Sequence, residues 1–383
     1  MKKLNLLHMV SIEGRGGTGA TASRIVKKLA ERGHNITFLA LPGSLSEEVA
    51  KDTAAKLVTD IEFRRGFRPF PFFRDVRRVR KIIREENIQI IHVHRSVEYW
   101  TAVAAIILSG RTVKLVRNRG IVVPIRGHCF NRLLHNRFTA LVIATATRIE
   151  ALYKSVKGFD QKKIVTLLDG VDVSAFRPDI DGQRVRREFG VGPDTFLIGI
   201  IARLSWIKGQ EFLLEAVARI RERHPAVKVL LVGKGQRREF LEGIIRQHGL
   251  EDAVVFAGFR KDIPDVLAAL DLFALPSVGS EGSSRGTLEA MAAGKAVVAS
   301  DVGVIPDVVV DLAANPEEGT GFIVPPKDRA ALAERLEVFL NDRALLTAAG
   351  GRGRARAEAL FDENLMVEKL EGLYETILGG GTV

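Results

Sequence analysis

Short apolar runs alternate along the whole chain with segments whose apolar residues recur at helical spacing. In the first half, the runs predict β-strands at residues 4–10, 36–41, 88–93, 114–116, 141–144 and 164–168. The periodic segments between them predict helices at 20–31, 74–85, 97–108 and 148–153. Strands that alternate with helices in this way are typical of βα units around a parallel sheet.

A second series of the same kind follows a polar stretch that contains Pro and Gly. It predicts strands at 196–201, 227–232, 254–257, 272–275 and 296–299, and helices at 210–222, 237–247, 263–269, 287–292, 329–341 and 363–378. The predicted fold class is therefore α/β, with two Rossmann-like doubly wound domains that face a cleft. We place the N-terminal domain at 1–175, a linker region at 176–194, the C-terminal domain at 195–362 and a final helix at 363–383 that is free to pack back on the N-terminal domain.

Composition excludes several other classes of protein. With 46% hydrophobic and 27% charged residues, the chain is not a disordered tail. Its single cysteine, Cys129, excludes a disulfide-stapled scaffold and a four-cysteine zinc site. Residues 1–10 predict a strand and not a targeting segment, and no run approaches the roughly 18 apolar residues of a membrane span. We expect a cytoplasmic protein, with peripheral attachment to the cytoplasmic face of a membrane as an alternative.

Positive charge is concentrated in the N-terminal half. The net charge is +11, but residues 1–185 hold 33 Lys and Arg against 17 Asp and Glu, whereas the remainder holds 24 against 29. This asymmetry points to an anionic partner of the N-terminal half: nucleic acid, an anionic membrane or a phosphorylated acceptor. Nothing in the sequence resembles a base-reading module, so we expect no nucleic-acid partner.

Two glutamates eight positions apart, Glu281 and Glu289, lie on either side of a run rich in small residues that leads into a helix. We expect Glu281 in a strand-to-helix loop and Glu289 inside the helix. Amides at a helix N-terminus bind phosphate, and carboxylates accept hydrogen bonds from hydroxyl groups. The segment suits a sugar diphosphate, although an ordinary βα loop with two exposed glutamates would have the same pattern.

Two cations follow the first strand of the second series. Arg203 ends that strand, and Lys208 opens the next helix beside Gly209. Cations at the carboxyl end of a strand can neutralise the charge that builds on a phosphate leaving group, in place of a metal. Taken alone, the two residues are more typical of solvent-exposed cations in a loop than of a phosphate-binding pair.

Together these segments resemble the retaining glycosyltransferases of the GT-B fold, and within them family 4, also called glycosyl transferases group 1. The resemblance covers nearly the whole chain, through the order and spacing of segments at 14–19, 91–94, 168–172, 203–209, 232–235, 258–260, 275–277, 281–289 and 320–325. It implies a hexosyltransferase that uses a UDP- or GDP-sugar as donor and needs no cofactor or metal. It also implies that the departing phosphate helps to deprotonate the acceptor on the front face of the sugar, so that the anomeric configuration is retained.

The resemblance also assigns roles to single residues. Arg203 and Lys208 would bind the donor diphosphate, Glu281 the hydroxyls of the transferred sugar, and Glu289 the ribose. His94 would lie near the reacting carbon and complete the catalytic set with Glu281, Lys208 and Arg203. Further donor contacts would come from Gly16, Gly17, Phe259, Arg260, Gly282, Ser283, Ser284, Thr287 and Leu288. Of the two histidines at 92 and 94, we expect only one to face the core, and we assign that role to His92.

Some positions depart from the family pattern. Asp169 stands where the family often has Asn, and Ser283 where an aromatic residue is common. Arg285 either contacts an anionic group of the donor or faces solvent, and the second is favoured. Asp179 and Asp181 form a D-x-D pattern typical of metal–nucleotide binding, but they lie in the expected linker, so we expect no metal there.

Residues 63–84 form a basic, aromatic segment with nine Lys or Arg, one Asp and five Phe. Val76, Val79, Ile82 and Ile83 make an apolar stripe that would pack a helix on its sheet, whereas the phenylalanines before that helix have no evident place in the core. The segment is either a surface helix or a site of attachment to an anionic membrane or acceptor.

The sequence thus predicts a retaining, metal-independent glycosyltransferase of lipopolysaccharide or polysaccharide biosynthesis. The C-terminal domain would bind the nucleotide sugar, and the basic N-terminal domain would bind a glycan or lipid-linked acceptor. A nucleotide-sugar 2-epimerase of the same architecture is the alternative. A binding protein with a degenerate site is disfavoured, because the charged residues of the site are all present.

Overall fold

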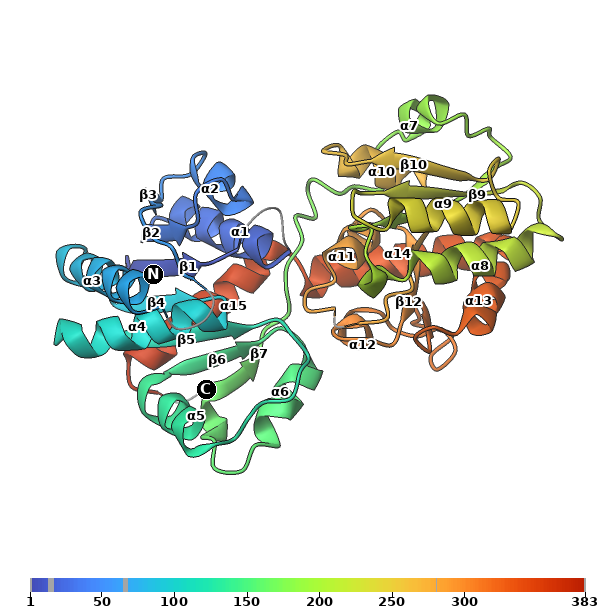
Figure 1. The fold of residues 1–383 in the computed structure, drawn as a ribbon. Coiled ribbons are helices and arrows are strands. Elements are labelled where there is room, and N and C mark those ends of the chain that lie inside the picture. Colours follow the sequence, from blue (N-terminus) through green and yellow to red (C-terminus); the bar gives the residue numbers. More distant parts are fainter. Residues whose placement is uncertain (1, 13–16, 65–67, 280, 382–383) are drawn as a thin grey trace. The chain divides into compact units, whose positions relative to one another are not determined.

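The computed structural model of the protein describes residues 2–12, 17–64, 68–279 and 281–381, and the chain divides into two compact units. Unit 1 comprises Met1–Asp169 and Asn364–Val383, and unit 2 comprises Gly170–Glu363. Each unit holds one parallel sheet with helices on both of its faces (Figure 1). The predicted fold class, with two doubly wound α/β domains, is confirmed.

Unit 1 contains a seven-stranded sheet in the order β3-β2-β1-β4-β5-β6-β7. Because the strand order reverses between β1 and β4, their carboxyl ends form the switch point at which such sheets bind ligands. The strands are β1 (Asn5–Val10), β2 (Asn35–Ala40), β3 (Lys56–Val58), β4 (Ile90–Val93), β5 (Lys114–Arg119), β6 (Leu141–Ala144) and β7 (Ile164–Thr166). The helices are α1 (Gly17–Glu31), α2 (Leu45–Ala50), α3 (Pro69–Glu85), α4 (Ser96–Ser109), α5 (Cys129–Leu133), α6 (Thr147–Lys154) and α15 (Glu363–Leu378), with short helices η1 (Leu134–Phe138) and η2 (Gln161–Lys163).

Two apolar cores lie on opposite faces of this sheet. One contains the stripe of α3, whose residues Val76, Val79, Ile82 and Ile83 are buried as predicted. The other contains α1 and the C-terminal helix α15, which contributes Val367, Leu370 and Tyr374. The last helix of the chain therefore completes the core of unit 1.

Unit 2 contains a six-stranded parallel sheet in the order β10-β9-β8-β11-β12-β13, with its switch point between β8 and β11. The strands are β8 (Phe196–Ile201), β9 (Val227–Val232), β10 (Val254–Gly258), β11 (Leu272–Leu275), β12 (Ala296–Ser300) and β13 (Gly321–Val324). The helices are α7 (Gln183–Glu188), α8 (Gln210–Arg221), α9 (Arg238–Gln247), α10 (Ile263–Ala269), α11 (Arg285–Ala292), α12 (Ile305–Val308), α13 (Arg329–Asn341) and α14 (Arg343–Leu360), with the short helix η3 (Trp206–Lys208).

The segment expected as a linker, 176–194, instead belongs to unit 2 and carries α7. A Cβ added to Gly182 would lie 2.3 Å from the backbone nitrogen of Ala269, so the segment packs directly on the end of α10. Arg186 donates to the carbonyl oxygen of Ala269 at 2.8 Å. The chain passes between the units at Asp169 and again at Glu363, earlier in the sequence than the expected boundary at 175.

Within the described residues, no helix combines the length and the apolar character needed to cross a lipid bilayer.

Candidate active site

Lys208 and Glu281 meet at the switch point of unit 2. Lys208 ends η3, after β8, and Glu281 lies in the loop between β11 and α11. The Lys208 Nζ donates to both carboxylate oxygens of Glu281, at 2.7 and 3.0 Å, and the Ser277 hydroxyl donates to the first of them at 2.5 Å. Glu281 is only 4% exposed. The two residues, 73 positions apart in sequence, therefore form a nearly buried ion pair.

Close backbone contacts fix the two loops that carry this pair. The amide of Val278 donates to the carbonyl oxygen of Ile207 at 2.8 Å, which joins the β11 loop to η3. Gly209 adopts a left-handed φ of 66°, and a Cβ there would lie 2.0 Å from the Pro276 carbonyl oxygen. Only glycine fits this position, so Gly209 allows Lys208 to approach Glu281.

Glu289 lies inside α11, as expected, but it is not exposed. Its carboxylate is buried and accepts a short hydrogen bond from the Arg285 Nε one turn earlier. Arg285 is half-exposed and forms an ion pair with Glu289. The sequence suggests either a contact with the donor or a side chain that faces solvent, and neither alternative includes this ion pair.

The start of α11 offers fewer donors than the resemblance implies. Ser284 caps the helix with a left-handed φ of 42°, and its carbonyl oxygen accepts from the amides of Thr287 and Leu288 at 2.9 and 3.2 Å. The amides of Arg285 and Gly286 have no partner within the described part of the chain. Gly282 and Ser283 lie in the loop before the helix. The amides of Thr287 and Leu288, which the resemblance assigns to the donor, are thus used within the helix, and the neighbouring amides of Arg285 and Gly286 lie between them and the expected donors at 282–284.

Arg203 is exposed, and its guanidinium has no partner among the described residues. Arg260 differs, because its guanidinium binds Asp262 at 2.7 and 2.9 Å and also binds Glu188 on α7. The hydrogen bonds that Arg260 donates to Glu188 and Asp262 raise the pKa of its guanidinium further above the ordinary value. The side chain of Arg260 is therefore a structural link to α7, and the neighbouring Phe259 is exposed.

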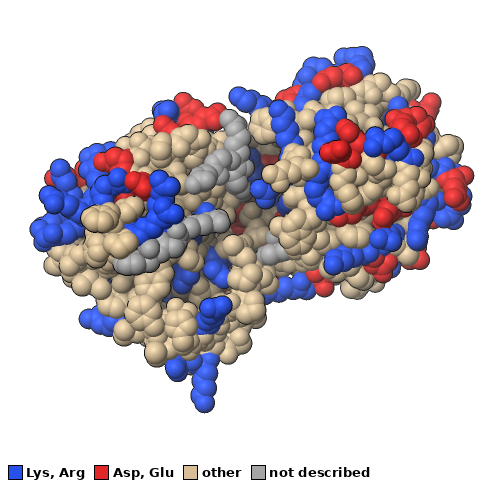
Figure 2. Space-filling view, in the orientation of Figure 1, with Lys and Arg blue, Asp and Glu red and all other residues tan. Residues whose placement is uncertain are grey.

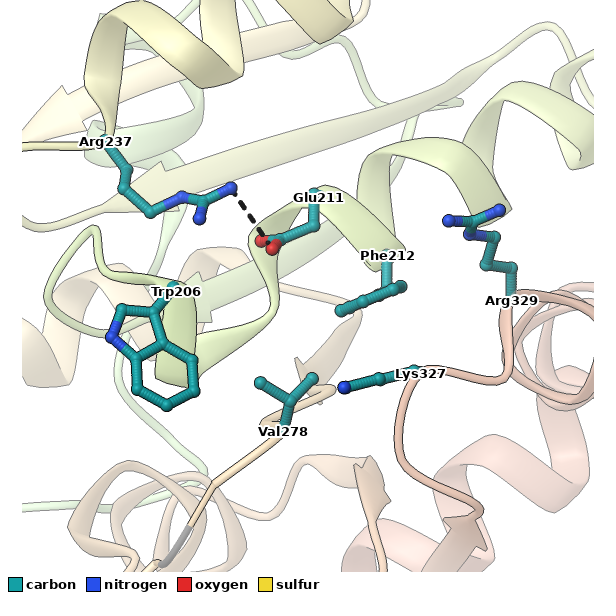
Figure 3. Close-up of a pocket in the computed structure, with 7 residues that line it drawn as sticks. All are labelled: Trp206, Glu211, Phe212, Arg237, Val278, Lys327 and Arg329. Carbon is teal, nitrogen blue, oxygen red and sulfur yellow. Dashed lines mark ion pairs between the residues drawn. The ribbon is translucent and has the colours of Figure 1, made fainter.

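A cavity of about 610 Å³ opens next to these loops, within the range of about 300–1,000 Å³ typical of small-molecule sites. Figure 3 shows Trp206, Val278 and Lys327 around it, with Glu211 paired to Arg237 at 3.2 Å. Phe212 and Arg329 complete the lining. Lys208 and Glu281 do not line this cavity, although Trp206 belongs to the same short helix as Lys208. The cavity could not be predicted from local sequence, because its lining comes from loops and helix starts that follow four different strands.

His94 follows β4 at the switch point of unit 1. Its amide and that of Arg95 donate to the buried carboxylate of Glu98 at 2.9 and 2.6 Å, which fixes the turn into α4. Burial lowers the pKa of His94 to about 3, so the imidazole is neutral at neutral pH. Gly17 begins α1, and Gly16 lies outside the described residues.

The expectation that only one of His92 and His94 faces the core is wrong. Both are buried, and their rings stack with centroids 4.5 Å apart. The physical reason is that residues two apart along a strand point to the same face of the sheet.

Asp169, which departs from the family pattern, is buried in the interior of unit 1. Its carboxylate accepts from the Thr21 hydroxyl at 2.7 Å and lies 3.7 Å from the Arg24 guanidinium. The side chain is 3% exposed. These contacts link α1 to the end of the first segment of unit 1, Met1–Asp169.

Replacing Asp169 by alanine should lower the free energy of unfolding of unit 1 by about 1.5–3 kcal/mol, because the Thr21 hydroxyl loses a charged acceptor in a buried place. The measurement is urea unfolding followed by Trp100 fluorescence in a Trp206→Phe background, since the chain has two tryptophans. Asp60→Ala is the control, because Asp60 also belongs to unit 1 and its ion pair with Arg78 is exposed to solvent and should contribute less than about 1 kcal/mol. Equal losses in both variants would contradict the role of Asp169.

Asp179 and Asp181, which fit the D-x-D pattern, form no common site. Asp179 pairs with Arg177 at 3.1 Å, and Asp181 accepts from the amide of Gln183 at the start of α7. Both groups have local structural partners.

The basic segment is only partly in the core. Phe63 is buried and Phe72 packs against the core, so the expectation that these two lie outside it is wrong. Phe70 and Phe73, near the start of α3, are 90% and 60% exposed. Arg74 pairs with Glu62 and Arg78 with Asp60, which neutralises part of the positive charge. Arg65 and Phe67 lie outside the described residues.

Two family models match the chain. Residues 15–175 match the model described as Glycosyltransferase Family 4, and residues 181–356 match that described as Glycosyl transferases group 1. These ranges correspond closely to the two units.

Curated relatives and solved structures are similar over most of the chain. The lipopolysaccharide core biosynthesis mannosyltransferase LpsB of Rhizobium meliloti is 28% identical over 80% of this chain and 84% of its own. The N-acetyl-alpha-D-glucosaminyl L-malate synthase of Bacillus anthracis is 25% identical over 95% and 94%. A glycosyltransferase structure from Rickettsia africae superposes with a TM-score of 0.84 at 21% identity, covering 99% of both chains. Anabaena Alr3699/HepE in complex with UDP-glucose gives 0.82 at 23%, covering 97% of this chain and 99% of the other. At these identities, the structural likeness shows the fold.

Proposed function

The chain is a glycosyltransferase of the GT-B fold, with a family 4 region followed by a group 1 region, and on this premise we propose that it is a retaining hexosyltransferase. The donor is a nucleoside diphosphate sugar, with UDP or GDP as the nucleotide, and the acceptor is a glycan or a lipid-linked sugar. The observation that carries the proposal is the Lys208–Glu281 ion pair at the switch point of unit 2, in which Glu281 is buried and Lys208 is partly exposed. Arg203, which follows β8 as Lys208 does, is exposed, and its guanidinium has no partner among the described residues.

The hydrogen-bonding capacity of the pair fits a sugar diphosphate. A lysine ammonium has three donors, and Lys208 gives two of them to Glu281, which leaves one for a phosphate oxygen. A carboxylate has about four acceptor sites, of which Lys208 and Ser277 use three. Glu281 can therefore accept one more hydrogen bond, from a sugar hydroxyl.

Arg203 and Lys208 would stabilise the diphosphate as it leaves. The bond between the anomeric carbon and the phosphate oxygen breaks, and the acceptor oxygen forms a new bond to that carbon on the same face. The acceptor proton passes to the departing phosphate, so the products are the glycosylated acceptor and a nucleoside diphosphate. The two cations oppose the charge that develops on the phosphate oxygens.

We assign His94 of unit 1 to positioning the sugar. Because burial lowers the pKa of His94 far below neutral, its ring adds no positive charge near the reacting carbon.

A role in building lipopolysaccharide or polysaccharide of the cell envelope is supported by the names of relatives. Besides the mannosyltransferase LpsB, a GDP-mannose-dependent phosphatidylinositol monomannoside mannosyltransferase of Corynebacterium glutamicum is 30% identical over 55% of this chain and 55% of its own. The acceptors in both names belong to lipid-anchored glycans.

An acceptor at a membrane would suit the surface of α3. Phe70 and Phe73 project from a helix rich in Arg, and Figure 2 shows Lys and Arg gathered where Figure 1 draws α3. We propose that this surface binds anionic lipid, with the cations at the headgroups and the two phenylalanines in the interface.

The double substitution Phe70→Ser with Phe73→Ser should weaken binding to anionic vesicles by at least about tenfold. It removes two aromatic rings whose apolar surface would be buried in the membrane interface. Co-sedimentation with vesicles of phosphatidylglycerol and phosphatidylcholine measures it, and Phe240→Ser, at an exposed position of unit 2, is the matched control. Equal binding of the unsubstituted protein to neutral and anionic vesicles would contradict the proposal.

A thermal-shift panel of nucleotides and nucleotide sugars tests the donor class, because a ligand of the native state raises the melting temperature. We expect a rise with either the UDP or the GDP series, and a smaller one in Arg203→Ala. No rise with any nucleoside diphosphate would contradict the proposed donor.

A further inference from the structure

Three histidines converge at the switch point of unit 1. His8 and His92 are register partners on β1 and β4, and His94 follows β4 directly. All three are buried, none more than 4% exposed. Each ring offers one nitrogen atom, and the three nitrogens lie within 4.8 Å of one another.

Polar groups outside the cluster hold one nitrogen of each ring. The Tyr374 hydroxyl lies 2.7 Å from the His92 Nδ1 and 3.5 Å from the His8 Nε2. The Asn118 amide lies 3.4 Å from the His94 Nδ1, and turning this amide by 180° directs its Oδ1, which has no partner among the described residues, to accept from the His94 N–H. Metal-binding histidines are typically held in this way, through the nitrogen that does not bind the metal.

The remaining nitrogens suit a metal ion. The His8 Nδ1 and the His94 Nε2 are 3.4 Å apart, and the His92 Nε2 has no hydrogen-bond partner among the described residues. Zn–N bonds of 2.0–2.1 Å at tetrahedral angles place two nitrogens about 3.3 Å apart. The separation between His8 and His94 matches this geometry, and the three ligand nitrogens lie within 4.8 Å of one another, so binding would draw the rings closer together.

The surroundings favour a transition metal over Mg²⁺ or Ca²⁺. All three imidazoles are buried, and a neutral imidazole keeps one lone pair for a metal. The carboxylate of Glu98, which reaches the backbone of His94, is occupied by the amides of Ser11, His94 and Arg95. Nitrogen ligands without a carboxylate suit Zn²⁺, Co²⁺, Ni²⁺ or Cu²⁺.

We propose that His8, His92 and His94 bind one divalent transition-metal ion, represented by Zn²⁺, and leave a fourth coordination position open. Binding takes up a nitrogen of His94 and thereby inhibits sugar transfer. This inhibition rests on the proposed function, whereas the binding itself does not.

Isothermal titration with ZnCl₂ tests the site in a Cys129→Ser background, because Cys129 is an exposed thiol. We expect one ion per chain, and a loss of affinity of at least about tenfold in His8→Gln and in His92→Gln. His248→Ala, at an exposed histidine of unit 2, is the matched control and should bind normally. No saturable binding, or unchanged affinity in both Gln variants, would overturn the proposal.

Because a buried substitution can disrupt folding, the protein with intact histidines is also titrated with CoCl₂. Four-coordinate Co²⁺ with three imidazoles absorbs strongly in the visible range, whereas six-coordinate surface-bound Co²⁺ absorbs weakly. The strong band is the expected result, and a weak band alone would contradict the site. In a transfer assay, Zn²⁺ should inhibit and EDTA should restore activity; a protein that binds Zn²⁺ but transfers no sugar would count against the proposed function only.

Discussion

Lys208→Ala should lower kcat by at least about 100-fold, the cost of removing one group that stabilises developing charge. The Nζ of Lys208 has one donor left beyond its bonds to Glu281, and this donor is directed to the diphosphate in the proposed reaction. The fold should persist, because Glu281 keeps the Ser277 hydroxyl as a partner. Steady-state kinetics with saturating acceptor measure kcat and KM for the donor. A change confined to KM would mean that Lys208 binds the ground state and not the transition state.

Glu281→Gln combined with Lys208→Ala tests whether the pair acts as a unit. Because the two groups share a partly buried ion pair, the double variant should be little worse than either single one, with a coupling energy of at least about 1 kcal/mol. Glu222→Gln, at the exposed end of α8, is the control and should retain full turnover. Additive losses would show that the two residues work independently.

Arg203→Ala should lower kcat/KM by about 100- to 1,000-fold without changing stability. Arg203 is exposed and has no side-chain partner among the described residues, so its removal leaves no buried group unpaired. Arg246→Ala, an exposed arginine near the end of α9, is the matched control for loss of positive charge. Kinetics and urea unfolding are measured on the same preparations. Normal kcat/KM in Arg203→Ala would remove this residue from the site.

The regular core strands could be predicted from the sequence because a buried parallel strand is a short, continuous apolar run. The helix α14 could not, since Gly350, Gly351 and Gly353 interrupt its pattern and glycine disfavours helices. Its glycine at 350 has a tertiary reason: a Cβ there would lie 2.2 Å from the carbonyl oxygen of Gly294. Such close packing of two backbones is not visible in local sequence.

In the candidate site, too, contacts between distant segments could not be predicted from local sequence. Lys208 and Glu281 each lie between a strand and the following helix, so each could be predicted as a candidate residue from its local sequence. Their ion pair could not, because it depends on β8 and β11 being neighbours in the sheet. A functional role for His8 could not be predicted, because a single histidine within an apolar strand has the same pattern as an ordinary core residue. Its place beside His92 and His94 follows from the pairing of β1 with β4, strands that are far apart in the sequence.

The most direct test of the account is to quantify both products of one reaction. The protein is incubated with the nucleotide sugar that stabilises it, with and without a glycan acceptor, and the acceptor is analysed by mass spectrometry while the nucleotide is analysed by chromatography. We expect the acceptor to gain one hexose for each nucleoside diphosphate released, with retention of the anomeric configuration, and both products to be lost in Glu281→Gln. Release of nucleotide at the same rate without acceptor, with no gain in acceptor mass, would contradict sugar transfer as the function of this protein.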